Sequence, residues 1–135
     1  MRKTLWALSA MVISATVWAD SAGAPSGRTG APGDGLCTSC HAGTANSGAG
    51  RVQVSLVNAA HWTPGQPVTV RVTVSDPSAL RWGFQLTARS GANPANPLGA
   101  LTATDATNTK LTASAGLQFI TQTTTGTRPG TSGSS

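Results

Sequence analysis

The strongest constraint on the fold of this chain is an alternation of apolar and polar residues in three short segments. The alternation occurs in residues 51–57 (RVQVSLV), 68–74 (VTVRVTV) and 82–88 (WGFQLTA). Side chains of a β-strand point alternately to its two faces, so a period of two places one apolar face on a core. These segments therefore predict three half-buried β-strands, separated by the turn signals TPGQP and SDPSALR.

Further strands are predicted in the second half of the chain, at residues 98–104, 110–113 and 117–123. No long amphipathic helix is visible outside the N-terminal apolar run. Five or six strands without helices predict an all-β fold, an immunoglobulin-like antiparallel β-sandwich. Such sandwiches have about seven strands, so we expect this one to be incomplete at its C-terminus. Residues 124–135 are low-complexity and offer no side chains for a core.

The N-terminus has the three parts of a secretory signal peptide. Arg2 and Lys3 form a basic start, residues 4–17 form a mainly apolar run, and Ala19 ends a cleavage site before Asp20. The apolar run is too short to span a bilayer, although an uncleaved anchor is the alternative. The sequence therefore predicts a secreted, periplasmic or cell-surface protein with no integral membrane segment after cleavage.

The mature chain is expected to hold one small domain with an irregular start and end. Residues 20–50 form a Gly- and Pro-rich segment, residues 51–123 the sandwich and residues 124–135 the tail. Removal of the signal peptide leaves seven basic and four acidic residues, and the basic ones are scattered as single surface charges. Nucleic-acid binding requires a clustered basic surface, so we expect no nucleic-acid partner.

Residues 37–41 (CTSCH) hold both cysteines of the chain and one of its two histidines. Cys-x-x-Cys-His is the attachment motif of c-type haem. Two thiols three positions apart can bond to the two vinyl groups of one porphyrin, and the adjacent histidine can ligate the iron. The motif therefore predicts covalent haem c on Cys37 and Cys40, with His41 as the proximal iron ligand.

Three other interpretations of this motif remain open. An oxidising compartment would favour a structural disulfide between Cys37 and Cys40. A thiol–disulfide redox motif usually lies at the start of a helix in a βαβ unit, and no such unit is predicted here. A zinc site would need more ligands, and only His61 and the four acidic residues are available.

The remaining candidate ligands and catalytic groups are few. The methionines, Met1 and Met11, lie in the predicted signal peptide, which excludes a methionine-ligated haem after cleavage. His61 is a possible distal ligand, but a histidine beside a Pro-Gly turn is also typical of an exposed turn residue. Asp34 can orient His41 by a hydrogen bond or form a turn in PGDG. Without a carboxylate pair or a Ser-His-Asp arrangement, we expect no enzyme.

Two stretches of the chain resemble bacterial secreted proteins of the choice-of-anchor V type. They are residues 26–43 (SGRTGAPGDGLCTSCHAG) and 64–91 (PGQPVTVRVTVSDPSALRWGFQLTARSG). The part WGFQLTAR is also similar to a core strand of the Reeler domain, and the resemblance covers residues 27–127. It implies an immunoglobulin-like β-sandwich on an exported protein, with a C-terminal anchoring or sorting segment and a histidine near Gln122. We expect this chain to lack that segment, the last strands and that histidine.

Two functions from different classes follow from these observations. The first is a secreted mono-haem c-type electron-transfer protein on a Reeler-like β-sandwich, with an unidentified redox partner. The alternative is an extracellular binding module without haem, in which Cys37 and Cys40 form a structural disulfide and the partner is a cell-surface component. The presence or absence of covalently bound haem distinguishes these two functions.

Overall fold

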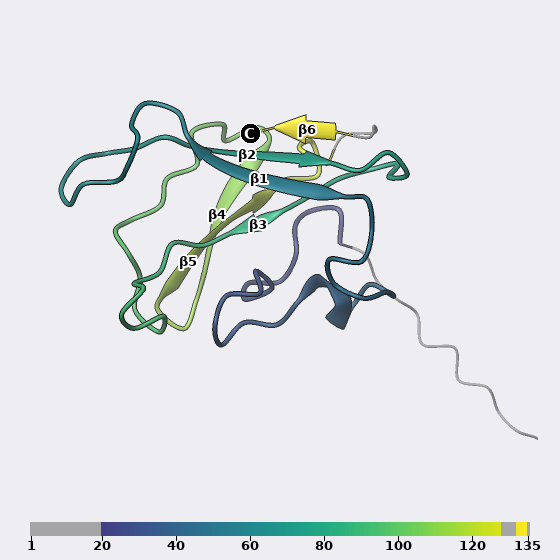
Figure 1. The fold of residues 1–135 in the computed structure, drawn as a ribbon, viewed down its shortest axis with the longest axis horizontal. Helices are drawn as coiled ribbons and strands as arrows, with labels where there is room; N and C mark the ends of the chain where they lie inside the picture. The colour runs from purple at the N-terminus through teal and green to yellow at the C-terminus, as the bar shows by residue number, and fades with distance from the viewer. Residues whose placement is uncertain (1–19, 128–131, 135) are drawn as a thin grey trace, which may run out of the picture.

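The computed structural model describes residues 20–127 and 132–134. The predicted signal peptide, residues 1–19, lies outside the described residues. The described chain is nearly all β, with six strands in two antiparallel sheets and a short 3-10 helix, η1 (Cys37–Ser39) (Figure 1). This confirms the predicted all-β class, whereas the immunoglobulin-like topology stays a prediction. No helix in the described part has the length and apolar character needed to cross a bilayer.

The first sheet has the strand order β1-β2-β6 and is antiparallel throughout. It consists of β1 (Arg51–Leu56), β2 (Val70–Ser75) and β6 (Ser132–Ser134). The pairing of β1 with β2 places Val52 opposite Val74 and Val54 opposite Val72. Residues directly opposite each other share a face of the sheet, so the valines of both strands form one apolar surface. The period-two pattern of the sequence specifies this register, because a slip by one residue would turn the valines to the other face.

The second sheet has the strand order β3-β5-β4 and is also antiparallel. It consists of β3 (Gln85–Leu86), β4 (Thr109–Ser114) and β5 (Leu117–Gln122). β4 and β5 form a hairpin whose two turn residues, Ala115 and Gly116, have φ angles of 50° and 78°. Positive φ at both positions marks a type I′ turn, which matches the twist of paired strands. The hairpin supplies most of the core, since Phe119 and Ile120 are buried.

Two predicted strands are shortened or absent. Residues 98–104 form no strand, and part of their backbone bonds to a side chain, as Leu101 N–H donates to Gln118 Oε1 at 2.8 Å. The strand predicted around Phe84 is reduced to the two residues of β3, since Phe84 N–H donates to Gln122 Oε1 at 3.0 Å instead of to a backbone carbonyl. Side chains of β5 thus replace part of the backbone ladder that the alternation predicted.

β6 lies in the part of the chain for which the sequence predicted only a low-complexity tail. It pairs with the end of β2, where Gly133 lies opposite Val74. Backbone hydrogen bonds need no particular side chain, so such a strand leaves no apolar pattern in the sequence. A Cβ at Gly133 would overlap the indole ring of Trp82. Glycine therefore lets β6 lie against this tryptophan.

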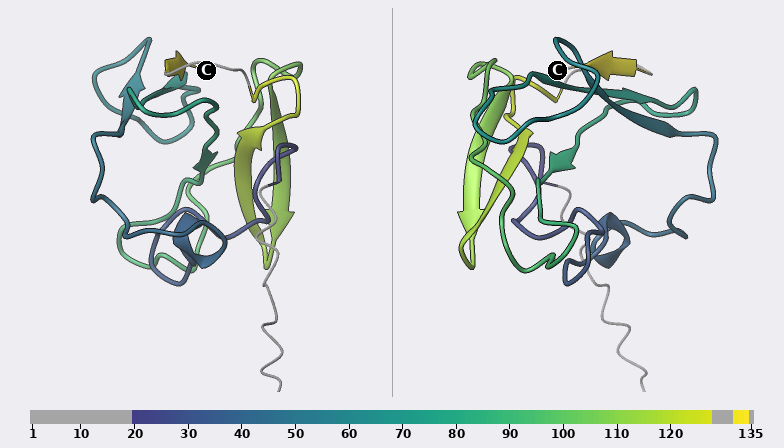
Figure 2. Two further views of the ribbon diagram at one scale, coloured as in Figure 1. Left: turned by 90° about the vertical axis from the view of Figure 1, so that its right-hand side faces the viewer. Right: turned by 60° about the vertical axis from the view of Figure 1, so that its left-hand side comes forward.

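In the described part of the chain few apolar side chains are buried, and they do not all lie between the two sheets, because consecutive residues of a strand such as Phe119 and Ile120 point to opposite faces. Among the described residues, the buried apolar side chains are Val72, Phe119 and Ile120. Val52 and Val54 share a face with Val72 but are 65 % and 58 % exposed. Figure 2 shows β1 and the β4–β5 hairpin on opposite sides of the molecule. The predicted half-burial of the first strand is therefore wrong, because no described segment covers β1.

Candidate functional site

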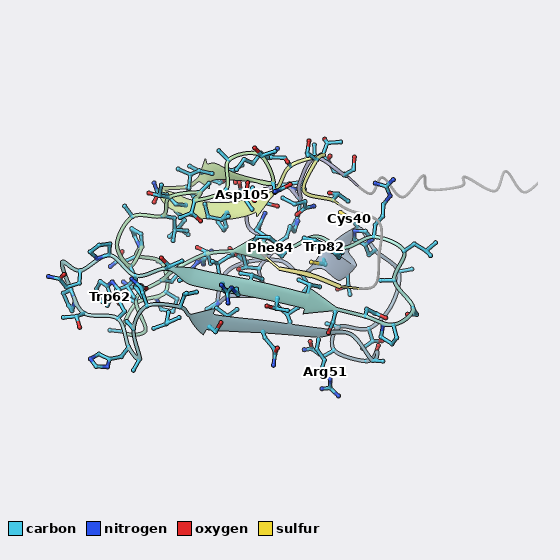
Figure 3. The ribbon with its side chains drawn as sticks, turned by 90° about the horizontal axis from the view of Figure 1, so that it is seen from above. Cys40, Arg51, Trp62, Trp82, Phe84 and Asp105 are labelled. Carbon is cyan, nitrogen blue, oxygen red and sulfur yellow. The ribbon has the colours of Figure 1, made fainter. Side chains whose placement is uncertain are left out.

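The CTSCH segment forms an exposed turn built around η1. The N–H groups of Cys40 and His41 both donate to Cys37 O, at 3.1 and 3.0 Å, and Ser39 N–H donates to Leu36 O at 3.0 Å. Cys37 begins η1 and Cys40 is its C-cap residue, so one short turn of backbone separates the two thiols. Both cysteines are exposed free thiols, and Figure 3 shows Cys40 near one end of the molecule. The exposed imidazole of His41 follows directly.

The segment before this turn is shaped by proline and glycine. Asp34 N–H donates to Ala31 O at 2.8 Å, which closes a four-residue turn with Pro32 second and Gly33 third. Gly33 has a φ of 90°, and proline followed by a residue of positive φ defines a type II turn. The predicted turn role of Asp34 is thus confirmed. Asp34 makes no hydrogen bond to His41 among the described residues, so the alternative role as its orienting group finds no support.

An ion pair joins this turn to the segment that follows β3. Arg89 Nη2 donates to Asp34 Oδ1 at 2.6 Å, and both side chains are only 7 % exposed. Arg89 Nη1 also donates to Pro32 O at 2.9 Å, and the guanidinium lies 5.8 Å from the ring centroid of Phe119 on β5. The second oxygen of Asp34 accepts from Thr29 Oγ1 at 2.6 Å. The prediction that Arg89 is a surface charge is therefore wrong. Arg89 is the last residue of the stretch WGFQLTAR that resembles the Reeler domain.

The surroundings of Asp34 lower its pKa. Burial of the carboxylate raises the pKa, but hydrogen bonds from Thr29 and Arg89 and the positive charge of Arg89 outweigh that effect. The pKa of Asp34 therefore lies below its ordinary value of 3.8. The carboxylate is ionised and the ion pair is intact at neutral pH.

Further hydrogen bonds fasten the Gly- and Pro-rich segment to the second sheet and its flanks. Arg28 N–H donates to Gln85 Oε1 at 2.7 Å, and Gln85 Nε2 donates to Ala24 O at 3.2 Å. Near the end of β5, Thr127 Oγ1 donates to Ser21 O at 2.7 Å. The segment is irregular, as the sequence predicts, yet it is built into the domain rather than attached as a flexible arm.

A positive charge lies beside the turn. The Arg28 guanidinium packs on Gly35, where a Cβ would overlap its Nη1, and Arg28 O accepts a hydrogen bond from Cys37 Sγ at 3.7 Å. Within the described residues Arg28 has no ion pair, and its Nε is buried without a hydrogen-bond partner. Like Arg89, Arg28 is a basic residue that lies near the cysteine turn in the structure, although nothing in the sequence indicates this position.

The structure does not bring His61 together with Cys37, Cys40 and His41. His61 is exposed in the loop between β1 and β2. It precedes Trp62, and Figure 3 shows Trp62 and Cys40 at opposite ends of the molecule. No group of three or more His, Cys, Asp or Glu side chains that could hold a metal ion occurs in the described part of the chain.

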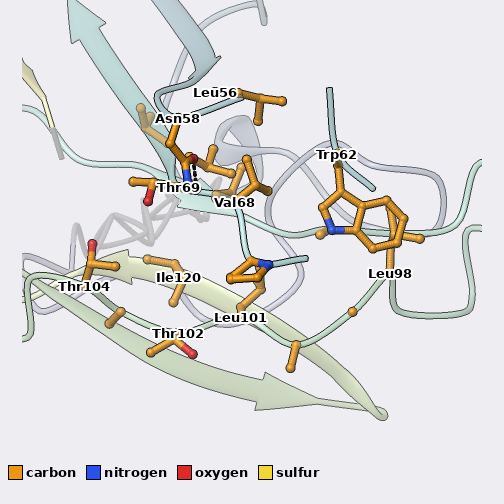
Figure 4. A pocket seen from close by; sticks show the side chains of 18 of the residues that line it. Leu56, Asn58, Trp62, Val68, Thr69, Leu98, Leu101, Thr102, Thr104 and Ile120 are labelled. Atoms are coloured by element: carbon orange, nitrogen blue, oxygen red, sulfur yellow. Dashed lines mark hydrogen bonds between the residues drawn. The ribbon is translucent and has the colours of Figure 1, made fainter. Parts of the chain in front are cut away.

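An apolar cavity of about 820 Å³ lies between the two sheets, with Trp62 among its lining residues (Figure 4). Its apolar lining includes Leu56, Trp62, Val68, Leu98, Leu101 and Ile120. This volume falls within the range of roughly 300–1,000 Å³ that is usual for small-molecule sites. None of the residues of the CTSCH turn lines it. The cavity and the cysteine turn are thus separate features of the fold.

Comparisons of the chain with protein-family models, with curated proteins and with solved structures find no match. The resemblance to choice-of-anchor V proteins and to the Reeler domain therefore stays a proposal.

Proposed function

We propose that this protein is a secreted mono-haem c-type electron-transfer protein. Cys37 and Cys40 carry the haem through thioether bonds, and His41 is the proximal iron ligand. The observation behind this proposal is the exposed turn, in which two free, exposed thiols at the ends of one short turn are followed directly by an imidazole. Because all three side chains are exposed, a porphyrin can approach them without displacing a packed residue.

The chemistry of attachment needs no oxidant. Each of the two thiols would add across one vinyl C=C bond of a haem held there, with the S–H bond broken, a C–S bond formed and the hydrogen transferred to the other vinyl carbon. A ring nitrogen of His41 would ligate the iron. When bound, haem supplies one-electron exchange between ferric and ferrous iron.

The rest of the domain holds the turn in place. Asp34 lies three residues before Cys37, and its ion pair with Arg89 ties that backbone to the segment that follows β3. A binding group keeps its geometry when the residues around it are themselves locked by packing and hydrogen bonds. The fixed charge of Arg28 beside the turn would favour the ferrous state, because ferrous iron carries one positive charge less than ferric iron.

Replacing His61 with alanine is expected to leave the visible spectrum of the haem protein unchanged, because His61 lies near the opposite end of the molecule from the cysteines. Absorption spectra of the ferric and ferrous forms, with and without carbon monoxide, measure this. His41→Ala is the matched histidine control and should alter the spectrum. A change from low-spin to high-spin iron in His61→Ala would instead make His61 the distal ligand.

Haem content tests the proposed function directly. Mature protein exported from cells with a working haem-attachment system should show a Soret band and one haem per chain in the pyridine haemochrome assay. Its intact mass should exceed that of the polypeptide by one haem. Protein without a Soret band, carrying a disulfide between Cys37 and Cys40, would contradict the proposal.

The second candidate is an extracellular binding module without haem. The apolar cavity between the sheets favours it, because a cavity of this size and lining can take a small apolar ligand. In that case Cys37 and Cys40 form a structural disulfide. Intact mass decides between the two candidates, since a disulfide removes two hydrogens whereas thioether formation adds a haem.

A further inference from the structure

β1 is the outermost strand of the first sheet, and one of its edges is free. Only β2 pairs with β1 among the described strands. Val57 N–H donates to Thr69 O at 2.9 Å, one step beyond the last paired residues of the two strands. Backbone groups along an antiparallel strand point alternately toward and away from the neighbouring strand. The N–H and C=O groups of Val52, Val54 and Leu56 therefore point to the free edge.

The usual protections of an edge strand are missing from β1. Natural edge strands carry lysines, prolines, bulges or inward-facing charges, or they are covered by another segment. The sequence of β1, RVQVSL, has one charge at its first residue and no proline, and its register with β2 contains no bulge. Five of its six residues are exposed. A regular strand with a free edge and an exposed apolar face is a template for the addition of another strand.

We propose that β1 pairs antiparallel with β1 of a second copy of this chain, about a two-fold axis at Val54. Val54 then lies opposite the partner's Val54, and Val52 lies opposite the partner's Leu56. All outward-pointing backbone groups of both strands find a partner in this register. The two three-stranded sheets join into one sheet of six strands.

The side chains of β1 favour a copy of the same strand as the occupant. On the face of Val52, Val54 and Leu56 apolar residues meet apolar residues across the axis, and on the other face Gln53 meets the partner's Ser55. Arg51 lies opposite the partner's Val57, so the two arginines at the strand ends are kept apart. A shift by one residue would place apolar side chains beside polar ones. This inference does not depend on the presence of haem.

Sedimentation equilibrium of the exported mature protein over a range of concentrations tests the proposal. The average mass of the wild type should rise from one chain toward two. Val54→Lys and Val54→Glu should each raise the dimer dissociation constant by about tenfold or more, because like charges meet at the axis. An equimolar mixture of the two variants should associate again. Leu80→Lys changes another exposed apolar residue, 85 % exposed and outside the sheets, and should behave as the wild type.

A peptide of residues 51–57 gives a second measurement that requires no variant to fold. It should compete for the free edge and dissociate the wild-type dimer. A wild type that stays monomeric at every concentration, or that stays monomeric while it binds the peptide, overturns the proposal. The same holds if Val54→Lys associates as the wild type does. Failure of the mixed variants to associate overturns the register centred on Val54.

Discussion

A protein in which both Cys37 and Cys40 are replaced with alanine is expected to carry no covalent haem. Each thioether bond needs one thiol, so the double variant can hold haem only through the iron bond to His41. That bond does not survive unfolding. Haem that remains with the denatured polypeptide, measured by haem staining of a denaturing gel and by the pyridine haemochrome assay, should fall to background.

The single variants and a control in the same turn sharpen this result. Cys37→Ala and Cys40→Ala should each keep one thioether bond and show a haemochrome band displaced toward that of haem with a free vinyl group. Ser39→Ala changes an exposed residue between the cysteines and should keep both bonds. Covalent haem in the double variant would show that attachment occurs elsewhere, and the proposed function would be wrong.

Replacing Arg89 with methionine is expected to lower the free energy of unfolding by about 3 kcal/mol or more, because it leaves the buried carboxylate of Asp34 without its cation. That is a large part of the roughly 5–15 kcal/mol by which a typical domain is stable. Urea unfolding of wild type and variant, prepared with the same haem content, measures the difference in the free energy of unfolding. Arg71→Met is the control, since Arg71 is exposed on β2, and should change stability by no more than about 0.5 kcal/mol. Equal stability of the two variants would show that the ion pair does not fasten the N-terminal segment.

The same ion pair predicts how stability depends on pH. The pKa of Asp34 is lower in the folded protein than its ordinary value of 3.8, so its contribution is fully present above that value. The contribution is lost as the pH falls through the lower, folded pKa. Asp34→Asn lacks this titration, so the difference in unfolding free energy between wild type and variant should shrink below pH 3.8. A difference that stays constant with pH would mean that Asp34 does not titrate in the folded protein as described.

Local patterns in the sequence determined the class of the fold and the composition of the candidate site. Alternating valines predicted β1 and β2, and the segments around Lys110 and Phe119 were predicted as the strands that became β4 and β5. These predictions hold because the direction of a side chain in a strand depends only on its own backbone. The Cys-x-x-Cys-His spacing likewise identified Cys37, Cys40 and His41 as candidate ligands of one haem. The attachment of haem to these residues stays a prediction.

Tertiary structure alone decided which distant residues meet. Arg89 and Asp34 are 55 positions apart, so no periodicity or motif spacing could pair them, and the pairing depends on where the irregular N-terminal segment packs. β6 is held by backbone hydrogen bonds, which leave no side-chain signature. The exposure of Val52 and Val54 depends on whether another segment covers β1. The pattern of a strand determines which face is apolar, but only the arrangement of the whole chain determines whether that face is buried.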